Sequence, residues 1–134
     1  MRQYKKLPNI DLSFKEKIDG TIILNDCNLL DSVASDWADA IKRTKRTQAR
    51  NFYDKILELE ADIEKRDFES VYPFIKMLNS KVAYGRNRKV VSPEFQDMMS
   101  QCLEQITNGE KGEQTFKHFK LFFEAVLGFF KGSN

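Results

Sequence analysis

"QTFKHFKLFFEAVLGFFK", residues 114–131, is the most hydrophobic stretch of this chain, and it decides the fold. Its apolar side chains recur at steps of three and four residues, which predicts a helix, but they cover more than one face of that helix. A helix that is apolar nearly all round lies at the centre of its own core or takes part in a subunit interface, and both remain open. The apolar positions are Phe116, Phe119, Phe122, Phe123, Val126, Leu127, Phe129 and Phe130.

Helical spacing also fills most of the chain before this stretch. We expect helices over residues 25–44, from Thr44 or Thr47 to Lys65, over 67–84, and from Pro93 to about 106. Gly85 is the predicted stop of the third of these helices, because glycine readily adopts the left-handed conformation just past a helix end. The predicted buried stripe of this third helix is Phe68, Val71, Phe74, Ile75, Leu78 and Val82.

The first 24 residues lack this periodicity. They contain Pro8, a turn signal at Gly20, and "TIIL", which is either a short strand or disordered. We therefore predict an all-α fold: a compact bundle of about five helices in a single domain, residues 25–134. Residues 1–24 are the predicted N-terminal extension, irregular or partly ordered.

Composition narrows the class of protein. Of the 134 residues, 41% are hydrophobic and 31% charged, as in a globular domain with a well-charged surface. No apolar run approaches the roughly 20 residues of a membrane span, and no secretory signal opens the chain. We expect a cytoplasmic protein without membrane contact.

Catalytic and metal-binding residues are sparse. Cys27 and Cys102 are far apart, and His118 is the only histidine, so a zinc site lacks ligands and no metal or other cofactor is expected. His118 is interpreted as a helix-surface or interface residue. Four acids between Glu58 and Glu64 alternate between two helix faces and do not converge. The sequence predicts no enzyme.

Charge is distributed unevenly, although the net charge is only +2. Two windows contain bases and no acid, one between Asp39 and Asp54 and one between Glu69 and Glu94. If the second and third helices are antiparallel, these windows become neighbours, and we predict one basic surface that binds phosphate. Free amides at the start of the second helix, near Thr47 and Gln48, would add donors. The bases are Lys42, Arg43, Lys45, Arg46, Arg50, Lys76, Lys81, Arg86, Arg88 and Lys89.

Aromatic residues lie beside the Lys and Arg residues of both windows in the sequence. The rings of Tyr53 and Tyr84 can stack on nucleobases. Helical spacing makes Phe52 and Tyr84 equally good core residues, so stacking on nucleobases is not predicted. An alternative to nucleic-acid binding is a helical adaptor that binds only protein. It would self-associate through its Phe-rich last helix.

Three segments together resemble a known family. "KRTQARNFYDKI", "PFIKMLNSKVAYGRNR" and "FQDMM" are similar to the small subunit of the type III-A CRISPR interference complex, the Csm complex. The first carries a Lys-x-Thr-Gln-x-Arg-x-Phe/Tyr signature from Lys45 to Tyr53. The second carries a Lys-x-Ala-Tyr segment from Lys81 to Tyr84, followed by an arginine, Arg86 or Arg88. The resemblance spans about residues 30–130.

This resemblance implies a function as well as a fold. Such subunits are small helical proteins that stack in several copies beside the guide RNA, contact the target RNA, and leave its cleavage to a neighbouring subunit. The implied partners are guide RNA, target RNA and other Csm subunits, with self-association into a dimer or stacked filament. Charge windows and resemblance together predict these RNA-binding residues: Lys42, Lys45, Arg46, Thr47, Gln48, Arg50, Lys81, Tyr84, Arg86 and Arg88.

Overall fold

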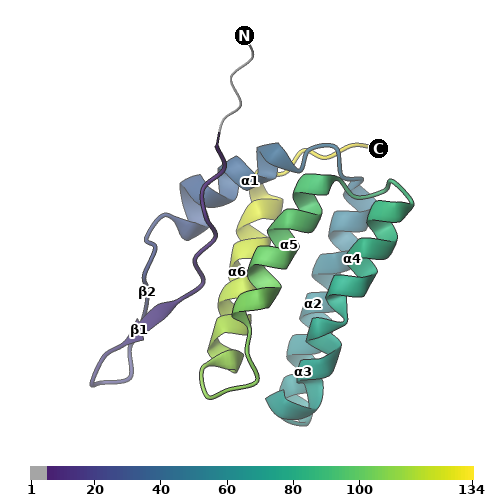
Figure 1. Cartoon of the computed structure of the whole chain (residues 1–134). Coiled ribbons are helices and arrows are strands. Elements are labelled where there is room, and N and C mark those ends of the chain that lie inside the picture. Colours follow the sequence, from purple (N-terminus) through teal and green to yellow (C-terminus); the bar gives the residue numbers. More distant parts are fainter. Residues whose placement is uncertain (1–5) are drawn as a thin grey trace.

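Helices make up most of the computed structural model, which describes residues 6–134 (Figure 1). The predicted all-α fold is confirmed, with five helices when α3 and α4 are counted as halves of one bent helix. The only strands in the described part form a small antiparallel hairpin. The elements are β1 (Phe14–Glu16), β2 (Ile22–Leu24), the π-helical turn η1 (Leu29–Val33), α1 (Ala34–Ala40), α2 (Arg46–Lys65), α3 (Phe68–Lys76), α4 (Leu78–Asn87), α5 (Pro93–Gln105) and α6 (Gly112–Phe129).

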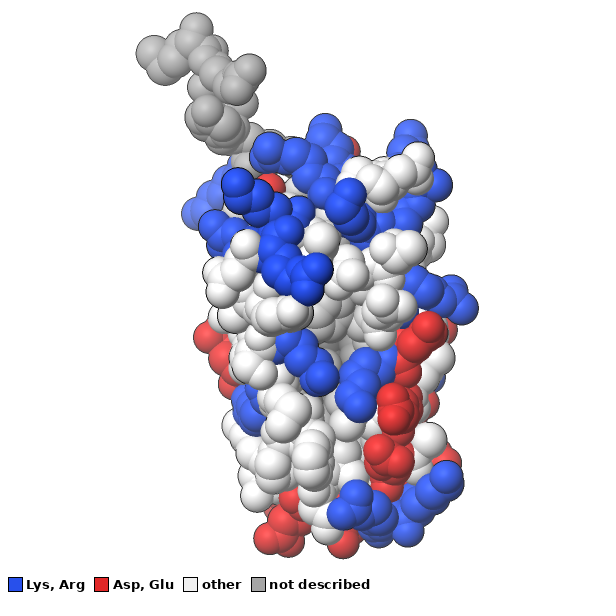
Figure 2. Space-filling model, turned by 90° about the vertical axis from the view of Figure 1, so that its right-hand side faces the viewer, with Lys and Arg blue, Asp and Glu red and all other residues white. Residues whose placement is uncertain are grey.

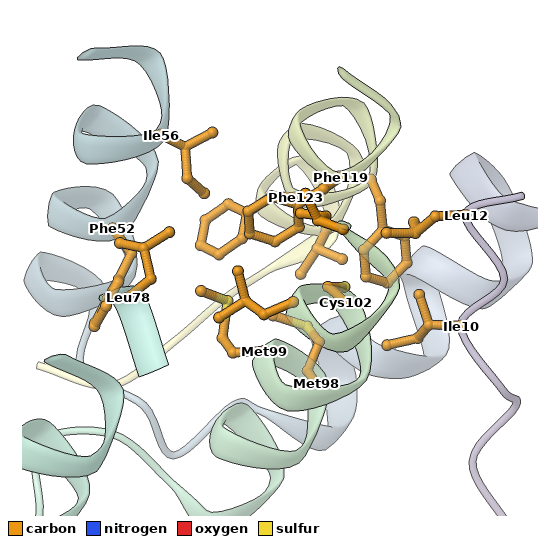
Figure 3. Close-up of a cluster of buried hydrophobic side chains, with 14 of the residues drawn as sticks. Ile10, Leu12, Phe52, Ile56, Leu78, Met98, Met99, Cys102, Phe119 and Phe123 are labelled. Atoms are coloured by element: carbon orange, nitrogen blue, oxygen red, sulfur yellow. The ribbon is translucent and has the colours of Figure 1, made fainter. Parts of the chain in front are cut away.

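Helix α6 lies in the middle of the bundle, where it packs against η1, α1 and α2. Four of its phenylalanines are fully buried, and Phe119 and Phe123 meet side chains from α2 and α5 in one cluster (Figure 3). Most apolar side chains of residues 114–131 are therefore buried or half-buried in the chain's own core. Leu121 and Phe129 are exceptions, because 38% and 46% of their surfaces are exposed.

Residues before η1 add to this core. Ile10 and Leu12 are buried, and their backbone N–H groups donate to the side-chain oxygens of Gln101 (3.2 Å) and Gln105 (2.8 Å). Trp37 of α1 donates its indole N–H to the backbone oxygen of residue 8 at 2.9 Å. These bonds satisfy the polar backbone of a segment that has no helix or sheet partner here. Residues 1–5 of the predicted extension lie outside the described residues.

His118 is buried beneath the same segment, so its assignment to the helix surface was wrong. It is 3% exposed, and its Nδ1 lies 3.0 Å from the carbonyl oxygen of Leu12. A carbonyl only accepts, so Nδ1 carries the proton, and Nε2 accepts from the Gln114 amide at 2.9 Å. Phe14 packs edge-on against the ring at 5.1 Å. The covering segment is about a hundred residues away in sequence, which explains why helical spacing did not reveal the contact.

Gly85 does not end a helix. It is buried inside α4, which continues to Asn87, and the left-handed residue is Lys89 with φ 61°. The Gly85 carbonyl accepts the N–H of residue 90 at 3.0 Å, and a Cβ at position 85 would lie 3.3 Å from Val91. Glycine is therefore suited to this position because the following loop folds back over it.

The predicted stripe of the third helix is also narrower than expected. Phe74 is 47% exposed, whereas Val71, Ile75, Leu78 and Val82 are buried. Those four follow a strict 4-3-4 spacing, and Phe74 falls beside that line, on the outer face of α3. The first predicted helix is shorter as well, because a turn and η1 precede α1.

Candidate nucleic-acid interface

Most bases of the two windows lie at one end of the bundle. Helix α2 begins there, and the α3–α4 helix runs back along the bundle to end there (Figure 1). Figure 2 shows Lys and Arg side chains gathered over the upper part of this face, with an acidic strip along one edge below them. The lower strip fits the acid-rich second half of α2.

A hollow separates α2 from α4. Helix α3 packs against α2, whereas α4 packs mainly against α5. The α3–α4 helix therefore diverges from α2 after the turn at Met77. Pro73, inside α3, lacks an N–H group, and Ser80 donates its hydroxyl to the Met77 carbonyl at 2.9 Å; both features bend helices. The resulting space, here called the α2–α4 hollow, has a volume of about 600 Å³. Its lining residues are Gln48, Asn51, Phe52, Lys55, Ser80, Lys81 and Tyr84.

The lining combines apolar, amide and cationic groups without an acid. Phe52 is only 7% exposed, as expected of a floor residue, and Tyr84 is 62% exposed. The prediction that Tyr84 is equally suited to the core was therefore wrong. Lys55 pairs with Glu58 at 3.5 Å, whereas Lys81 has no ion pair within residues 6–134. Lys81 therefore offers an uncompensated charge.

Arg86 and Arg88 leave α4 in different directions. Arg88 donates to the Tyr84 hydroxyl at 2.8 Å, and its guanidinium carbon lies 5.4 Å from the centre of the Tyr84 ring. Arg86 instead donates to the side-chain oxygen of Gln96 on α5 at 2.7 Å. Of the two candidate family arginines, Arg88 is thus associated with the α2–α4 hollow, and Arg86 with the side facing α5.

A second, smaller hollow of about 260 Å³ lies on the α5 side. It contains three cations from the two windows, Arg43, Arg86 and Lys89. Among residues 6–134, only Arg43 of these three has an acidic partner, Glu94 at 3.7 Å. Residues of the two windows therefore lie together in both hollows, which divide the basic surface, but of the five bases of the first window only Arg43 lines either hollow.

The start of α2 is not an open anion site. The Gln48 amide donates to the Lys45 carbonyl at 3.0 Å, and the Arg46 amide donates to the Ser133 carbonyl at 2.9 Å. Lys45 itself donates its amide to Val90 at 3.1 Å and its ammonium group to the backbone oxygen of residue 134 at 3.0 Å. Of the free amides predicted near Thr47 and Gln48, the Gln48 amide is therefore not free, because the chain's last residues and the preceding turn occupy much of this helix end.

The other predicted residues at this helix entrance are exposed. Arg50 forms a surface pair with Asp54 at 3.4 Å, one helical turn along α2, and such exposed pairs hold a side chain only weakly. Thr47 and Arg46 project into solvent. Lys42 lines a third hollow beside α1. These four side chains are accessible, but they do not line the α2–α4 hollow.

Sequence reasoning missed three residues of the hollow, namely Asn51, Lys55 and Ser80. A signal was present in the sequence. Positions 51 and 55 lie three and seven residues after Gln48, which places all three on one face of α2. Ser80 precedes Tyr84 by one turn of α4. Charge, the start of α2 and the family motifs selected the predicted residues, and none of these signals depends on which face of a helix a residue occupies.

Tyr53 and Cys102 have raised pKa values and line neither of the two hollows. Tyr53 donates its hydroxyl to Glu124 at 2.7 Å, and this bond, with partial burial, raises the pKa of Tyr53 to about 12. Its ring also stacks on Phe123, with the ring centres 6.2 Å apart. Burial raises the pKa of the Cys102 thiol. Tyr53 therefore links α2 to α6, and its ring is engaged within the protein.

Acidic groups near α2 point in different directions. Glu60 pairs with Lys120 of α6 at 3.4 Å, while Glu58 pairs with Lys55 on its own helix. Between residues 6 and 134, no three His, Cys, Asp or Glu side chains are grouped so as to hold a metal ion. No helix in the same range is long and apolar enough to cross a membrane.

Comparison with known proteins identifies the family. The family model Csm2 Type III-A matches residues 25–134, which include every helix and both hollows. No curated protein and no solved structure matches the chain. The match covers most of the sequence and agrees with the resemblance carried by the Lys45–Tyr53 and Lys81–Tyr84 motifs. The chain therefore belongs to the Csm2 type III-A family, the small subunits of the type III-A Csm complex.

Proposed function

We propose that this subunit binds the RNA of a Csm complex without cutting it, through contacts with the RNA backbone. The observation that carries the proposal is the acid-free α2–α4 hollow, in which Gln48 from the first window lies with Lys81 and Tyr84 from the second. Lys and Arg side chains beside it supply charge for phosphates on either side. Phosphate contacts fix the position of RNA without reading its sequence, which suits a subunit that serves any guide.

Several copies stacked along one RNA would make the binding strong. A single copy that neutralises about three phosphates has a salt dependence of only about −2 in log–log slope on a single strand, so it binds weakly alone. Neighbouring copies raise the effective concentration of each contact. We place the protein in the cytoplasm with guide RNA, target RNA and the other Csm subunits, and we assign it no cofactor.

Charge reversal in the assembled complex tests this proposal. The triple variant Arg46→Glu, Arg50→Glu, Lys81→Glu should lower the retention of target RNA, measured by filter binding. The matched control reverses Lys15, Lys17 and Lys65, which are also exposed but lie on the hairpin and at the far end of α2. If the triple variant assembles and binds target RNA as well as the control does, the proposal is wrong.

The protein-only adaptor remains a second candidate because Phe129 is exposed at the end of α6. Phe130 is half-buried and packs against the core, so its replacement would also disturb the fold. Phe129→Ser is therefore the cleaner variant. Light scattering should report a smaller mass for this variant if the Phe-rich helix mediates self-association, and an unchanged mass would exclude that role for Phe129.

A further inference from the structure

We propose that the α2–α4 hollow receives a nucleobase turned out of the RNA stack, rather than a phosphate group alone. This inference rests on the proposed RNA binding and adds a second contact to it. The hollow has a volume of about 600 Å³, within the range of small-ligand sites. It therefore has room for a base and part of its ribose.

The lining residues suit a base better than they suit a phosphate. A phosphate only accepts hydrogen bonds, whereas the carboxamides of Gln48 and Asn51 each donate and accept, as base edges do. The buried ring of Phe52 offers an apolar surface that a phosphate cannot use. The lining of the second hollow, on the α5 side, includes three cations but no carboxamide and no aromatic ring, so its chemistry favours phosphate instead.

Tyr84 supplies the stacking surface. Its ring lines the hollow while 62% of the residue is exposed, so it can be reached from solvent without any rearrangement of the core. Arg88 lies over the ring and donates to its hydroxyl, which limits the ring's freedom before RNA arrives. A base that stacks on a ring with restricted freedom loses less of its binding energy to the ordering of the ring.

Lys81 and Lys55 complete the site. Both line the hollow, and both can reach phosphates that flank an inserted base. Flexible carboxamides and an aromatic face accept any base, so insertion adds affinity without adding sequence preference. The site therefore remains compatible with a subunit that serves guides of every sequence.

Removal of the bases from the RNA tests the proposal. The full chain is titrated at low salt with a single-stranded RNA of about 12 nucleotides, and with an abasic strand of the same length and charge. Wild-type protein should bind the base-bearing strand about five-fold or more tightly than the abasic one. Two variants at exposed positions, Tyr84→Ala and Ser80→Trp, should bring this ratio near one. The first removes the stacking ring, and the second fills the hollow.

Phe74→Ala is the matched control, because Phe74 is an exposed aromatic residue of the same bent helix and lies outside the hollow. It should keep the wild-type ratio. A ratio near one for the wild-type protein, or a wild-type ratio in both hollow variants, would overturn the base proposal and leave backbone binding intact. Failure of both strands to bind, to the free chain and to the assembled Csm complex, would overturn the proposed function itself.

Discussion

The backbone N–H of Arg46 donates to the carbonyl oxygen of Ser133 at 2.9 Å, which joins the first residue of α2 to the end of the described chain. Ser133 returns two bonds, from its N–H to Thr44 and from its hydroxyl to Arg43, both at 3.1 Å. Figure 1 shows this tail crossing the top of the bundle from the end of α6. The tail thus fixes the backbone of the first basic window.

Gly132→Ala should release this tail. Gly132 has φ +66°, and an added Cβ would lie 2.5 Å from the Arg46 side chain and 2.6 Å from the Phe130 ring. A non-glycine residue in this conformation costs about 1–3 kcal/mol even without such contacts. We expect faster hydrogen exchange at the Arg46 amide, measured by NMR or mass spectrometry.

Gly128→Ala is the control for this experiment. Gly128 is in α6, and a Cβ there meets nothing within 4 Å, so alanine should be neutral or slightly stabilising. Equal exchange at the Arg46 amide in the two variants would show that the tail does not hold the start of α2.

Leu12→Ala should destabilise the whole bundle, although residue 12 precedes the family match. Leu12 is fully buried, and removing such a side chain typically costs about 2–5 kcal/mol. Ile18→Ala, at the fully exposed tip of the hairpin, should change little. Chemical denaturation of both variants measures the difference. Equal stability would mean that the segment before η1 does not contribute to the core.

Ionisation of the Tyr53 hydroxyl should lower the stability of the folded protein in strong alkali. Its pKa is raised to about 12, because ionisation breaks the bond to Glu124 and adds a second negative charge beside it. An unfolded tyrosine has a pKa of about 10. The stabilising effect is therefore complete below pH ~10 and is lost as the pH rises towards 12.

Ultraviolet titration of tyrosinate, together with thermal melts at each pH, measures this effect. Tyr53→Phe keeps the ring that stacks on Phe123 and removes the hydroxyl. It should abolish the latest tyrosine transition and flatten the melting temperature over the same window. An unchanged titration curve in this variant would contradict the assignment.

Lys81→Gln should reduce the salt dependence of RNA binding. If Lys81 neutralises one phosphate, the log–log slope on single-stranded RNA should become shallower by about 0.7. Lys65→Gln removes an equally exposed charge from the far end of α2 and should leave the slope unchanged. A slope that responds equally to both variants would indicate a general effect of net charge.

Some local signals in the sequence predicted helices correctly, whereas the predicted stop at Gly85 was wrong. A helix was predicted from Pro93, and α5 begins there, with the Ser92 hydroxyl accepting the Phe95 amide at 3.2 Å. Helical spacing likewise predicted a helix from Thr44 or Thr47 to Lys65, where α2 spans Arg46–Lys65. Such features depend on residues a few positions apart, so they are visible without knowledge of the fold.

Long-range contacts could not be predicted in this way. The burial of His118 depends on Leu12, and the engagement of the Arg46 amide depends on Ser133, each across most of the chain. The division of the basic surface depends on the direction of α4 after Met77. Charge counts do not contain that direction, because it results from how α4 packs on α5.

The bend at Met77 also separates the stability of the hydrophobic core from the ligand preference of the α2–α4 hollow. The main-chain path of α3 and α4 sets the width of the α2–α4 hollow, while exposed side chains such as Ser80, Lys81 and Tyr84 supply most of its chemistry. Substitutions at these positions leave the hydrophobic core in place. Natural selection or protein engineering can therefore change the ligand preference of the hollow at little cost to folding.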